Sequence, residues 1–222
     1  MKKSILTFAA VCLLALPGTA TAQGLGIGGR VGTLGAGAEA ALGLSSHLVI
    51  RGGVGLLPLK PVTNISGIDF TLTLPKTWYN VGVDIYVSSA MRIGAGMLFK
   101  PDDPVLDGTV TGSRSVTIGD STYTATSVSA LHGVLTSKKS APYVLLGFGN
   151  HTASGFGLFL DLGVAFLGDP AVSLSAEGDP TVVQSAVFQT ELRKEEANIQ
   201  NDVGTYLKLW PILNLGLRFG LS

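Results

Sequence analysis

Residues 213–221 read LNLGLRFGL, a segment in which large apolar side chains alternate with glycine, asparagine and arginine. Neighbouring side chains of a β-strand point to opposite faces, so one face of this segment would be wholly apolar and the other small and polar. The apolar face comprises Leu213, Leu215, Leu217, Phe219 and Leu221. This pattern is typical of a barrel strand that faces lipid on one side and a narrow lumen on the other.

The same alternation recurs in seven other segments, at residues 25–31, 36–44, 48–57, 79–87, 91–99, 143–149 and 158–166. In these segments the face opposite the apolar one is rich in glycine and carries isolated charges. A soluble β-sandwich or lipocalin-like barrel also alternates, but its bulky apolar residues point inward. Glycines and single charges could not fill a soluble core. The sequence therefore predicts an all-β fold, an eight-stranded antiparallel transmembrane β-barrel.

Composition agrees with a membrane protein that has no membrane-spanning helix. Hydrophobic residues make up 46% of the chain and charged residues 14%, whereas soluble domains contain about 25% charged residues. The best helical candidate after the N-terminal region, residues 141–160, is interrupted by glycine, asparagine, histidine and serine. Because only helices and closed barrels satisfy their backbone hydrogen bonds in lipid, a barrel is favoured.

Residues 1–22 have the organisation of a secretory signal peptide. Two lysines precede an apolar run at 5–16, Pro17-Gly18 ends the run, and residues 20–22 read ATA, a small-residue cleavage site. We expect cleavage before Gln23, which leaves residues 23–222 as one outer-membrane β-barrel domain. The alternative, a membrane anchor, requires about 20 apolar residues.

Removal of this segment also removes Cys12, the only cysteine, and leaves two more acidic than basic residues. We therefore expect no disulfide or thiol chemistry and no nucleic-acid partner.

Connections between the strand segments alternate between short and long. Residues 45–47, 88–90 and 150–156 are short, and residues 59–77, 101–140 and 168–210 are long. Outer-membrane barrels have short periplasmic turns and long extracellular loops, so both termini should be periplasmic.

That arrangement requires a further reversal near Leu34-Gly35, where the apolar parity changes. A two-residue turn there gives eight strands and places Arg30 directly opposite Glu39. The alternative is a β-bulge in one long strand, which would not give eight strands.

The long loops carry patterns of their own. Residues 68–74 alternate and could extend the barrel wall, and residues 101–140 predict an extended hairpin. Between residues 182 and 207, apolar residues such as Leu192 and Ile199 recur at helical spacing, with charges between them. This predicts one amphipathic helix in the last loop, packed on the barrel rim. A membrane-surface or partner-binding helix is the alternative.

Short motifs along the chain resemble a family of bacterial outer-membrane β-barrel proteins, OmpA/OmpX-like in barrel size. They are VGTLG at 31–35, APY at 141–143, FLDLGV at 159–164, and EEA at 195–197 followed by WP at 210–211. The resemblance implies location in the cell outer membrane and no established activity. Gly216 and Phe219 also resemble the signal read by the barrel-assembly machinery, a partner during biogenesis, although Phe219 is followed by three more residues.

Residues suited to catalysis or metal binding are sparse. His47, His132 and His151 fall in two predicted turns and one long loop, so they should not converge on a metal. Ser154 lies near His151 but has no evident carboxylate partner. The run GLGIGG at 24–29 lacks the preceding strand and following helix of a dinucleotide loop. We therefore expect no enzyme, no cofactor and no metal.

The charges of the lumen face form the one candidate functional set. Its members are Arg30, Glu39, Arg51, Asp84, Arg92, Asp161 and Arg218. Buried charges persist when paired, and an eight-stranded barrel is just wide enough inside for side chains. The set therefore predicts a salt-bridged plug, although the same residues could line a narrow gated path.

Two functional hypotheses follow from these alternatives. The first is a non-enzymatic envelope protein, embedded in outer-membrane lipids, that anchors extracellular loops for structural or adhesive work on a ligand that the sequence does not identify. The second is a narrow channel or transporter for small solutes or ions.

Overall fold

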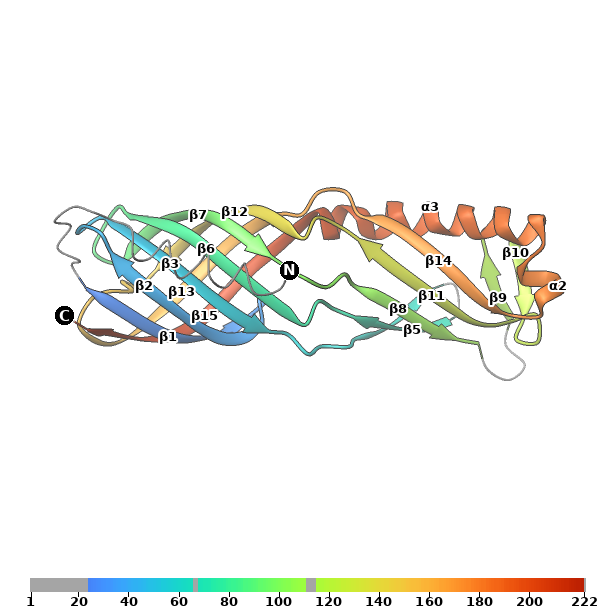
Figure 1. The fold of residues 1–222 in the computed structure, drawn as a ribbon, viewed down its shortest axis with the longest axis horizontal. Coiled ribbons are helices and arrows are strands. Elements are labelled where there is room, and N and C mark those ends of the chain that lie inside the picture. The colour runs from blue at the N-terminus through green and yellow to red at the C-terminus, as the bar shows by residue number, and fades with distance from the viewer. Residues whose placement is uncertain (1–23, 66–67, 111–114, 222) are drawn as a thin grey trace, which may run out of the picture.

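The computed structural model describes residues 24–65, 68–110 and 115–221. The expected signal peptide, residues 1–22, lies outside the described residues. The described chain has two parts along its long axis, a barrel at one end and an extension of strands and helices at the other (Figure 1). In the described ranges, no helix combines the length and apolarity needed to span a bilayer.

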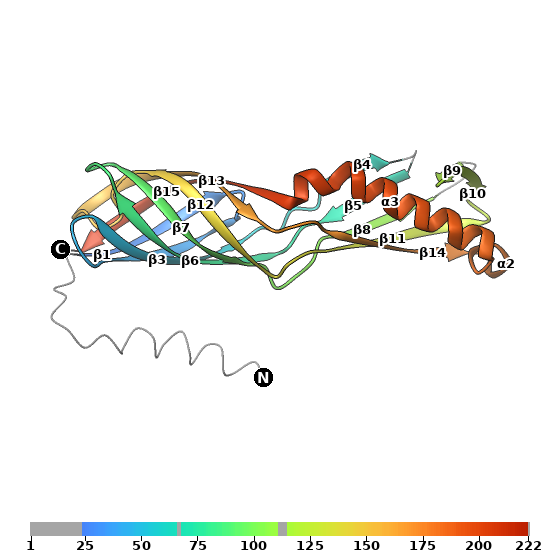
Figure 2. The same cartoon turned by 90° about the horizontal axis from the view of Figure 1, so that it is seen from above.

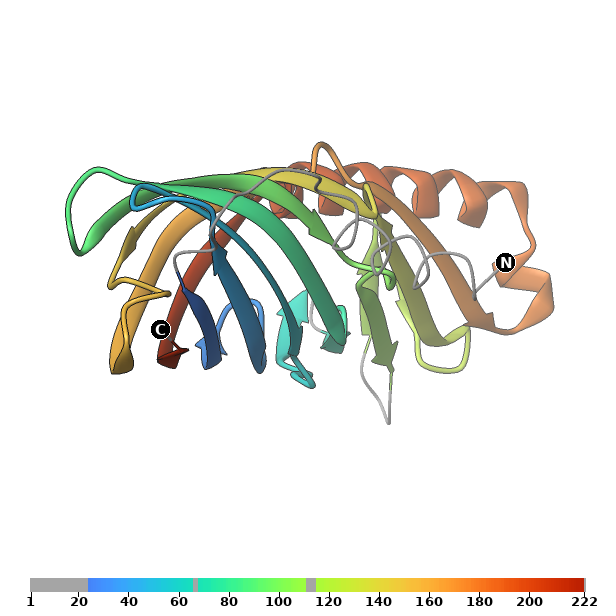
Figure 3. The same ribbon diagram turned by 60° about the vertical axis from the view of Figure 1, so that its left-hand side comes forward.

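Eight antiparallel strands close the barrel in the order β1-β15-β13-β12-β7-β6-β3-β2. This confirms the predicted fold class. Their bounds are β1 (Leu25–Gly32), β2 (Ala36–Gly43), β3 (Leu48–Leu56), β6 (Thr77–Tyr86), β7 (Met91–Phe99), β12 (Ser140–Phe148), β13 (Gly155–Phe166) and β15 (Leu209–Leu221). The strands tilt strongly, and β15 ends away from the extension (Figure 3).

The barrel wall is apolar outside and mixed inside. In β6 the outward residues Tyr79, Val81, Val83 and Ile85 are 41–54% exposed, whereas Trp78, Asn80, Asp84 and Tyr86 are buried. Exposed aromatic residues also stand near both ends of the wall, as in the aromatic girdles of membrane barrels. They are Tyr79, Phe99 and Phe166 toward the extension, and Phe148 and Phe156 toward the turns.

The β1–β2 connection is a tight turn, as expected, but its register differs from the prediction. The Gly35 amide donates to the Gly32 carbonyl at 2.9 Å, and Gly35 has a φ of 85°, which favours glycine. Thr33 and Leu34 are therefore the central residues, one position earlier than expected. Arg30 consequently pairs with Gly37, and Glu39 pairs with Gly28. The expectation that Arg30 lies directly opposite Glu39 was wrong by two residues.

The three long loops build the extension. A five-stranded sheet has the order β14-β11-β8-β5-β4, and a separate hairpin pairs β10 with β9. The bounds are β4 (Val62–Ile65), β5 (Ile68–Thr73), β8 (Val105–Thr109), β9 (Ser115–Ile118), β10 (Ser121–Thr124), β11 (Val128–Thr136) and β14 (Ala171–Gly178). β8 pairs with β11, as the predicted hairpin requires, but the sequence analysis missed β14.

The last loop contains two helices where one was predicted, α2 (Pro180–Val183) and α3 (Ala186–Lys208). They are separate because Ser185 caps α3: its hydroxyl accepts from the Phe188 amide at 3.2 Å. α3 runs along one face of the extension sheet (Figure 2). Phe188, Leu192 and Ile199 share a buried core with sheet residues such as Leu131. The expected packing on the barrel rim is corrected accordingly, since these side chains find a larger apolar surface on the sheet.

Candidate functional site

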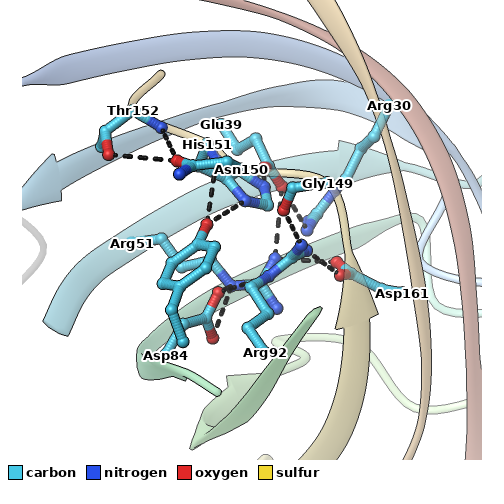
Figure 4. Close-up of polar contacts among 11 residues, drawn as sticks. Arg30, Glu39, Arg51, Asp84, Arg92, Gly149, Asn150, His151, Thr152 and Asp161 are labelled. Carbon is cyan, nitrogen blue, oxygen red and sulfur yellow. Dashed lines mark hydrogen bonds and ion pairs between the residues drawn. The ribbon is translucent and has the colours of Figure 1, made fainter. Parts of the chain in front are cut away.

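Six of the seven predicted lumen residues form one buried ion-pair network (Figure 4). Arg51 lies at its centre. Its Nη1 atom is 2.8 Å from Asp161 Oδ2 and 3.6 Å from Glu39 Oε2, and its Nε atom is 3.0 Å from Asp84 Oδ2. One guanidinium therefore joins three carboxylates that come from three other strands.

Arg92 links two of the same carboxylates a second time. Its Nε atom is 2.8 Å from Asp84 Oδ2, and its Nη2 atom contacts Asp161. Arg92 Nη1 also donates to the Gly149 carbonyl at 2.6 Å. Glycine is needed beside this group, since a Cβ atom at Gly147 would lie 2.4 Å from Arg92 Cζ. The glycine-rich lumen face thus makes room for long charged side chains.

Arg30 completes the network from β1. Its Nη1 atom lies 3.5 Å from Glu39 Oε2, and its Nη2 atom donates to Asn80 Oδ1 at 2.7 Å. Although the two residues are diagonal and not directly opposite, the long side chains still meet. Three arginines balance three carboxylates, and every charged side chain of the network is at most 1% exposed.

His151 belongs to the network and was missed by the sequence analysis. Its Nε2 atom is 2.5 Å from Glu39 Oε1, its backbone amide donates to the Tyr86 hydroxyl at 2.9 Å, and its ring lies 4.6 Å from that of Phe159. The side chain is 2% exposed because the turn that carries it folds into the barrel mouth. Strand alternation does not extend into turns, so no pattern marked this residue.

Arg218 faces the lumen but does not join the network. It donates to the backbone carbonyls of Ala153 and Gly155, the latter at 3.1 Å. Over residues 24–65, 68–110 and 115–221 it has no ion pair with a carboxylate. The prediction that it joins the salt-bridged plug was therefore wrong, since Arg30, Arg51 and His151 already surround the Glu39 carboxylate.

An apolar layer fills the lumen on the extension side of the charges. Trp78 is fully buried and stacks on Trp210, with ring centroids 4.8 Å apart. Their neighbours in the same buried cluster are Leu34, Leu57, Leu98, Ala141, Tyr143, Leu145, Ala165, Leu167 and Ile212. Two layers of buried side chains therefore occupy the lumen, one of paired charges and one of packed apolar residues.

A second polar group lies on the extension. His132 Nδ1 is 2.9 Å from Asp107 Oδ1, and Nε2 is 3.5 Å from Glu177 Oε1. These three residues come from adjacent strands and remain largely exposed. Across the described ranges, no cluster of three or more histidine or acidic residues is suited to a metal ion.

The hydrogen bond from His132 to Asp107 raises the pKa of His132 above its ordinary value of 6.5, with a smaller contribution from Glu177. The charged imidazole should therefore stabilise the extension fully below about pH 6.5, and this contribution should be lost as pH rises through the raised pKa. An NMR titration of His132 should show the upward shift. Asp107→Asn should reduce it more than Glu177→Gln, and equal effects would contradict the assigned cause.

Comparison with known proteins finds similarity in structure alone. No protein-family model matches the chain, and no curated protein matches it in sequence. CarO2 of Acinetobacter baumannii superposes with a TM-score of 0.62 at 20% identity, covering 89% of this chain and 98% of that protein. CarO of the same organism gives 0.54 at 16% identity, covering 91% and 99%.

A major outer membrane protein from Thermus thermophilus gives a TM-score of 0.44 at 11% identity, covering 89% of this chain and 98% of that protein. The likeness to the two Acinetobacter barrels agrees with the closed barrel and lipid-facing surface described above. The chain thus has an outer-membrane β-barrel fold.

Proposed function

We propose that this chain is a non-enzymatic outer-membrane protein whose barrel anchors the extension at the cell surface, in a structural or adhesive role. The observation that carries the proposal is the buried ion-pair network inside the barrel. Six ion pairs join the network, with side chains at most 1% exposed. Polar groups so fully engaged with one another suit a plug better than a reaction site.

The free-energy cost of opening a path through the barrel favours an anchor over a channel. Separating a buried ion pair leaves uncompensated charge, at about 3–5 kcal/mol for each pair broken. A path through the barrel would have to break several such pairs and also move the stacked Trp78 and Trp210 rings. A narrow channel for small solutes or ions is therefore the second candidate, favoured only by the charged residues that line part of the lumen.

The extension is the part available to an external partner. It lies at the end with the long connections, which is the extracellular end in outer-membrane barrels. Its own core, which includes Phe70, Leu106 and Phe188, is separate from the core of the lumen. Binding residues are often carried by such connecting segments on a rigid scaffold, so we place an extracellular ligand there, of unassigned chemistry.

Conductance separates the two candidates. Purified wild-type protein in a planar bilayer should give no sustained ion current, because both layers of the lumen are filled. A gel shift between unboiled and boiled samples would verify that the barrel is folded. A stable wild-type conductance that Arg30→Ala abolishes would reject the anchor and favour the channel.

The remaining parts of the proposal concern biogenesis. We propose that residues 1–22 are removed, that the barrel-assembly machinery inserts residues 23–222, and that the protein is OmpA/OmpX-like in its use of a small barrel. The protein should fractionate with the outer membrane, and its N-terminal residue should be Gln23 by sequencing. Recovery of the mature protein from the soluble periplasm would contradict this assignment.

A further inference from the structure

Five exposed lysines lie where the barrel wall meets the extension. The extension sheet continues five barrel strands in the same order, because the chain joins β3 to β4, β5 to β6, β7 to β8, β11 to β12 and β13 to β14. The joining segments are residues 57–61, 74–76, 100–104, 137–139 and 167–170. With the last residue of α3, they contain six of the seven lysines after residue 22, so lysine is concentrated at this junction. Lys100 is buried, and the five exposed members, here called the lysine belt, are Lys60, Lys76, Lys138, Lys139 and Lys208.

Three lysines of the belt have the same position relative to a barrel strand. Lys76, Lys139 and Lys208 each directly precede a strand that enters the barrel from the extension, namely β6, β12 and β15. Each backbone carbonyl accepts from an amide of the adjacent segment, at 2.8–2.9 Å. These hydrogen bonds hold the three backbones at the edge of the wall, so the ammonium groups are anchored there and not on a free loop.

The belt lies just beyond the exposed aromatic residues of the wall. Phe99 and Phe166 pair in register with the first residues of β12 and β15. Those first residues directly follow Lys139 and Lys208, so each lysine is one strand residue, about 3.3 Å, beyond the aromatic level. Aromatic girdles of membrane barrels mark the interface between the hydrocarbon layer and water. The lysine belt is therefore at the level of the lipid headgroups.

The charge of the belt is only partly neutralised. Lys208 Nζ is 2.9 Å from Asp169 Oδ1 and Lys139 Nζ is 4.0 Å from Asp103 Oδ2, yet the two lysine side chains are 52% and 66% exposed. The other three lysines of the belt have no ion pair with any residue that the structure describes. Six lysines and three aspartates, including Asp102, lie in the junction, so its net charge is +3.

The opposite end of the wall has no comparable charge. The turns at residues 45–47, 88–90 and 150–154 contain no lysine, arginine, aspartate or glutamate. The belt is thus confined to the end with the long connections, which is the extracellular end in outer-membrane barrels. Contact with lipid in general would not distinguish the two ends, whereas contact with an anionic lipid of the outer leaflet would.

The spacing of the belt suits a headgroup with more than one phosphate. β12 and β15 are the two neighbours of β13 in the barrel, so Lys139 and Lys208 are two strand spacings apart, about 10 Å. Each carries a compact ammonium group on a flexible stem, which binds phosphate as a point charge. Two phosphates on one headgroup could therefore each meet a lysine.

We propose that the lysine belt binds the phosphate groups of a diphosphorylated glycolipid, of the lipid A class, in the outer leaflet. A membrane lipid fits better than a free phosphate ion, because the belt follows the edge of the lipid-facing wall. This inference rests on the proposed outer-membrane location. It adds recognition of one headgroup to a wall that otherwise contacts only acyl chains.

Lipid retention tests the site. The protein is inserted into phosphatidylcholine vesicles that contain diphosphoryl lipid A, extracted in mild detergent, and its bound lipid A counted by native mass spectrometry. The monophosphoryl form with the same acyl chains should be retained about fivefold more weakly, the effect of one lysine near an anionic surface. High salt should release both forms, since exposed charges are screened. Equal retention of the two forms, or retention unaffected by salt, would overturn the proposal, because acyl chains alone would then explain the binding.

A matched pair of double variants provides the control. Lys138→Gln with Lys139→Gln should weaken retention of diphosphoryl lipid A about 25-fold, at about fivefold for each lysine. Arg193→Gln with Lys194→Gln also neutralises two adjacent exposed cations, but should leave retention unchanged. The helical rise separates Lys194 from Lys208 by about 20 Å. A gel shift between unboiled and boiled samples verifies that both variants fold, and equal retention by the two would overturn the proposal.

Two further measurements separate the alternatives. Titration calorimetry of the lipid-free protein in detergent should show no saturable binding of inorganic phosphate. Saturable binding that Lys138→Gln with Lys139→Gln removes would overturn the lipid assignment in favour of a free phosphate ion. Failure of the protein to insert into vesicles at all would instead reject the proposed membrane anchor, whereas insertion without retained lipid A would reject only the function of the lysine belt.

Discussion

Replacing Arg51 with methionine should lower the free energy of unfolding of the barrel by about 3–5 kcal/mol. Arg51 contacts the carboxylates of Glu39, Asp84 and Asp161 in a site with at most 1% side-chain exposure. Methionine keeps much of the length and apolar bulk of the side chain but removes the charge. Three carboxylates then share two network arginines, so one negative charge is left uncompensated away from water.

Urea titration of the protein folded in lipid vesicles measures this loss. Arg218→Met is the matched control, since it removes an inward arginine that hydrogen-bonds to backbone carbonyls. Its cost should be smaller, about 1–3 kcal/mol. Adding Asp161→Asn to Arg51→Met should restore part of the stability because it removes the excess charge. Equal losses for the two arginine variants, or no recovery in the double variant, would show that the network is not the source of stability.

The strands could be predicted because a lipid-facing wall imposes a strict two-residue period. Val81, Val83 and Ile85 are outward, and Asp84 and Tyr86 inward, as their parity requires. The register of β1 against β2 could not be predicted in the same way. It depends on which residue takes the left-handed conformation at the turn, and that residue is Gly35. Parity alone is compatible with a shift of two residues.

β14 was missed for a different reason. Residues 171–178 do alternate, with Val172 and Leu174 buried and Ser173 and Ser175 exposed. The segment nevertheless depends on pairing with β11, which lies some forty positions earlier in the chain. A single sequence does not reveal such a long-range partner, whereas the adjacent helical periodicity is visible locally.

The lumen network was also predicted only in part: the sequence indicates which face a side chain lies on, but not which group that side chain contacts. Alternation placed Arg30, Arg51 and Arg92 on the inner face, and all three meet carboxylates there. It also placed Arg218 there, but that side chain meets backbone carbonyls of the 150–155 turn. The same inward fold of the turn brings His151 to Glu39. Side-chain direction follows from the sequence pattern, whereas the path of a turn across the barrel mouth does not.

Introducing arginine in the middle of the lipid-facing wall should also have a large effect. Val83 lies near the centre of β6, faces outward, and is 41% exposed on a surface otherwise covered by apolar side chains. Val83→Arg should lower the free energy of unfolding in vesicles by about 2–4 kcal/mol, the cost of a cation at the bilayer midplane. Val87 continues the same outward row beyond the last residue of β6 and is 51% exposed.

Val87→Arg is therefore a control with the same residue change at a different depth. Its cost should be only about 0–1 kcal/mol, because an arginine near the interface can reach water and headgroups. Denaturant titrations of both variants in the same vesicles give the comparison. Val83 and Val87 lie on the same outward row of one strand that crosses the bilayer once, so the two sites differ mainly in their depth in the membrane. If Val83→Arg and Val87→Arg are equally tolerated, then β6 does not cross a membrane with this face in the lipid, and the assignment of the outer wall is wrong.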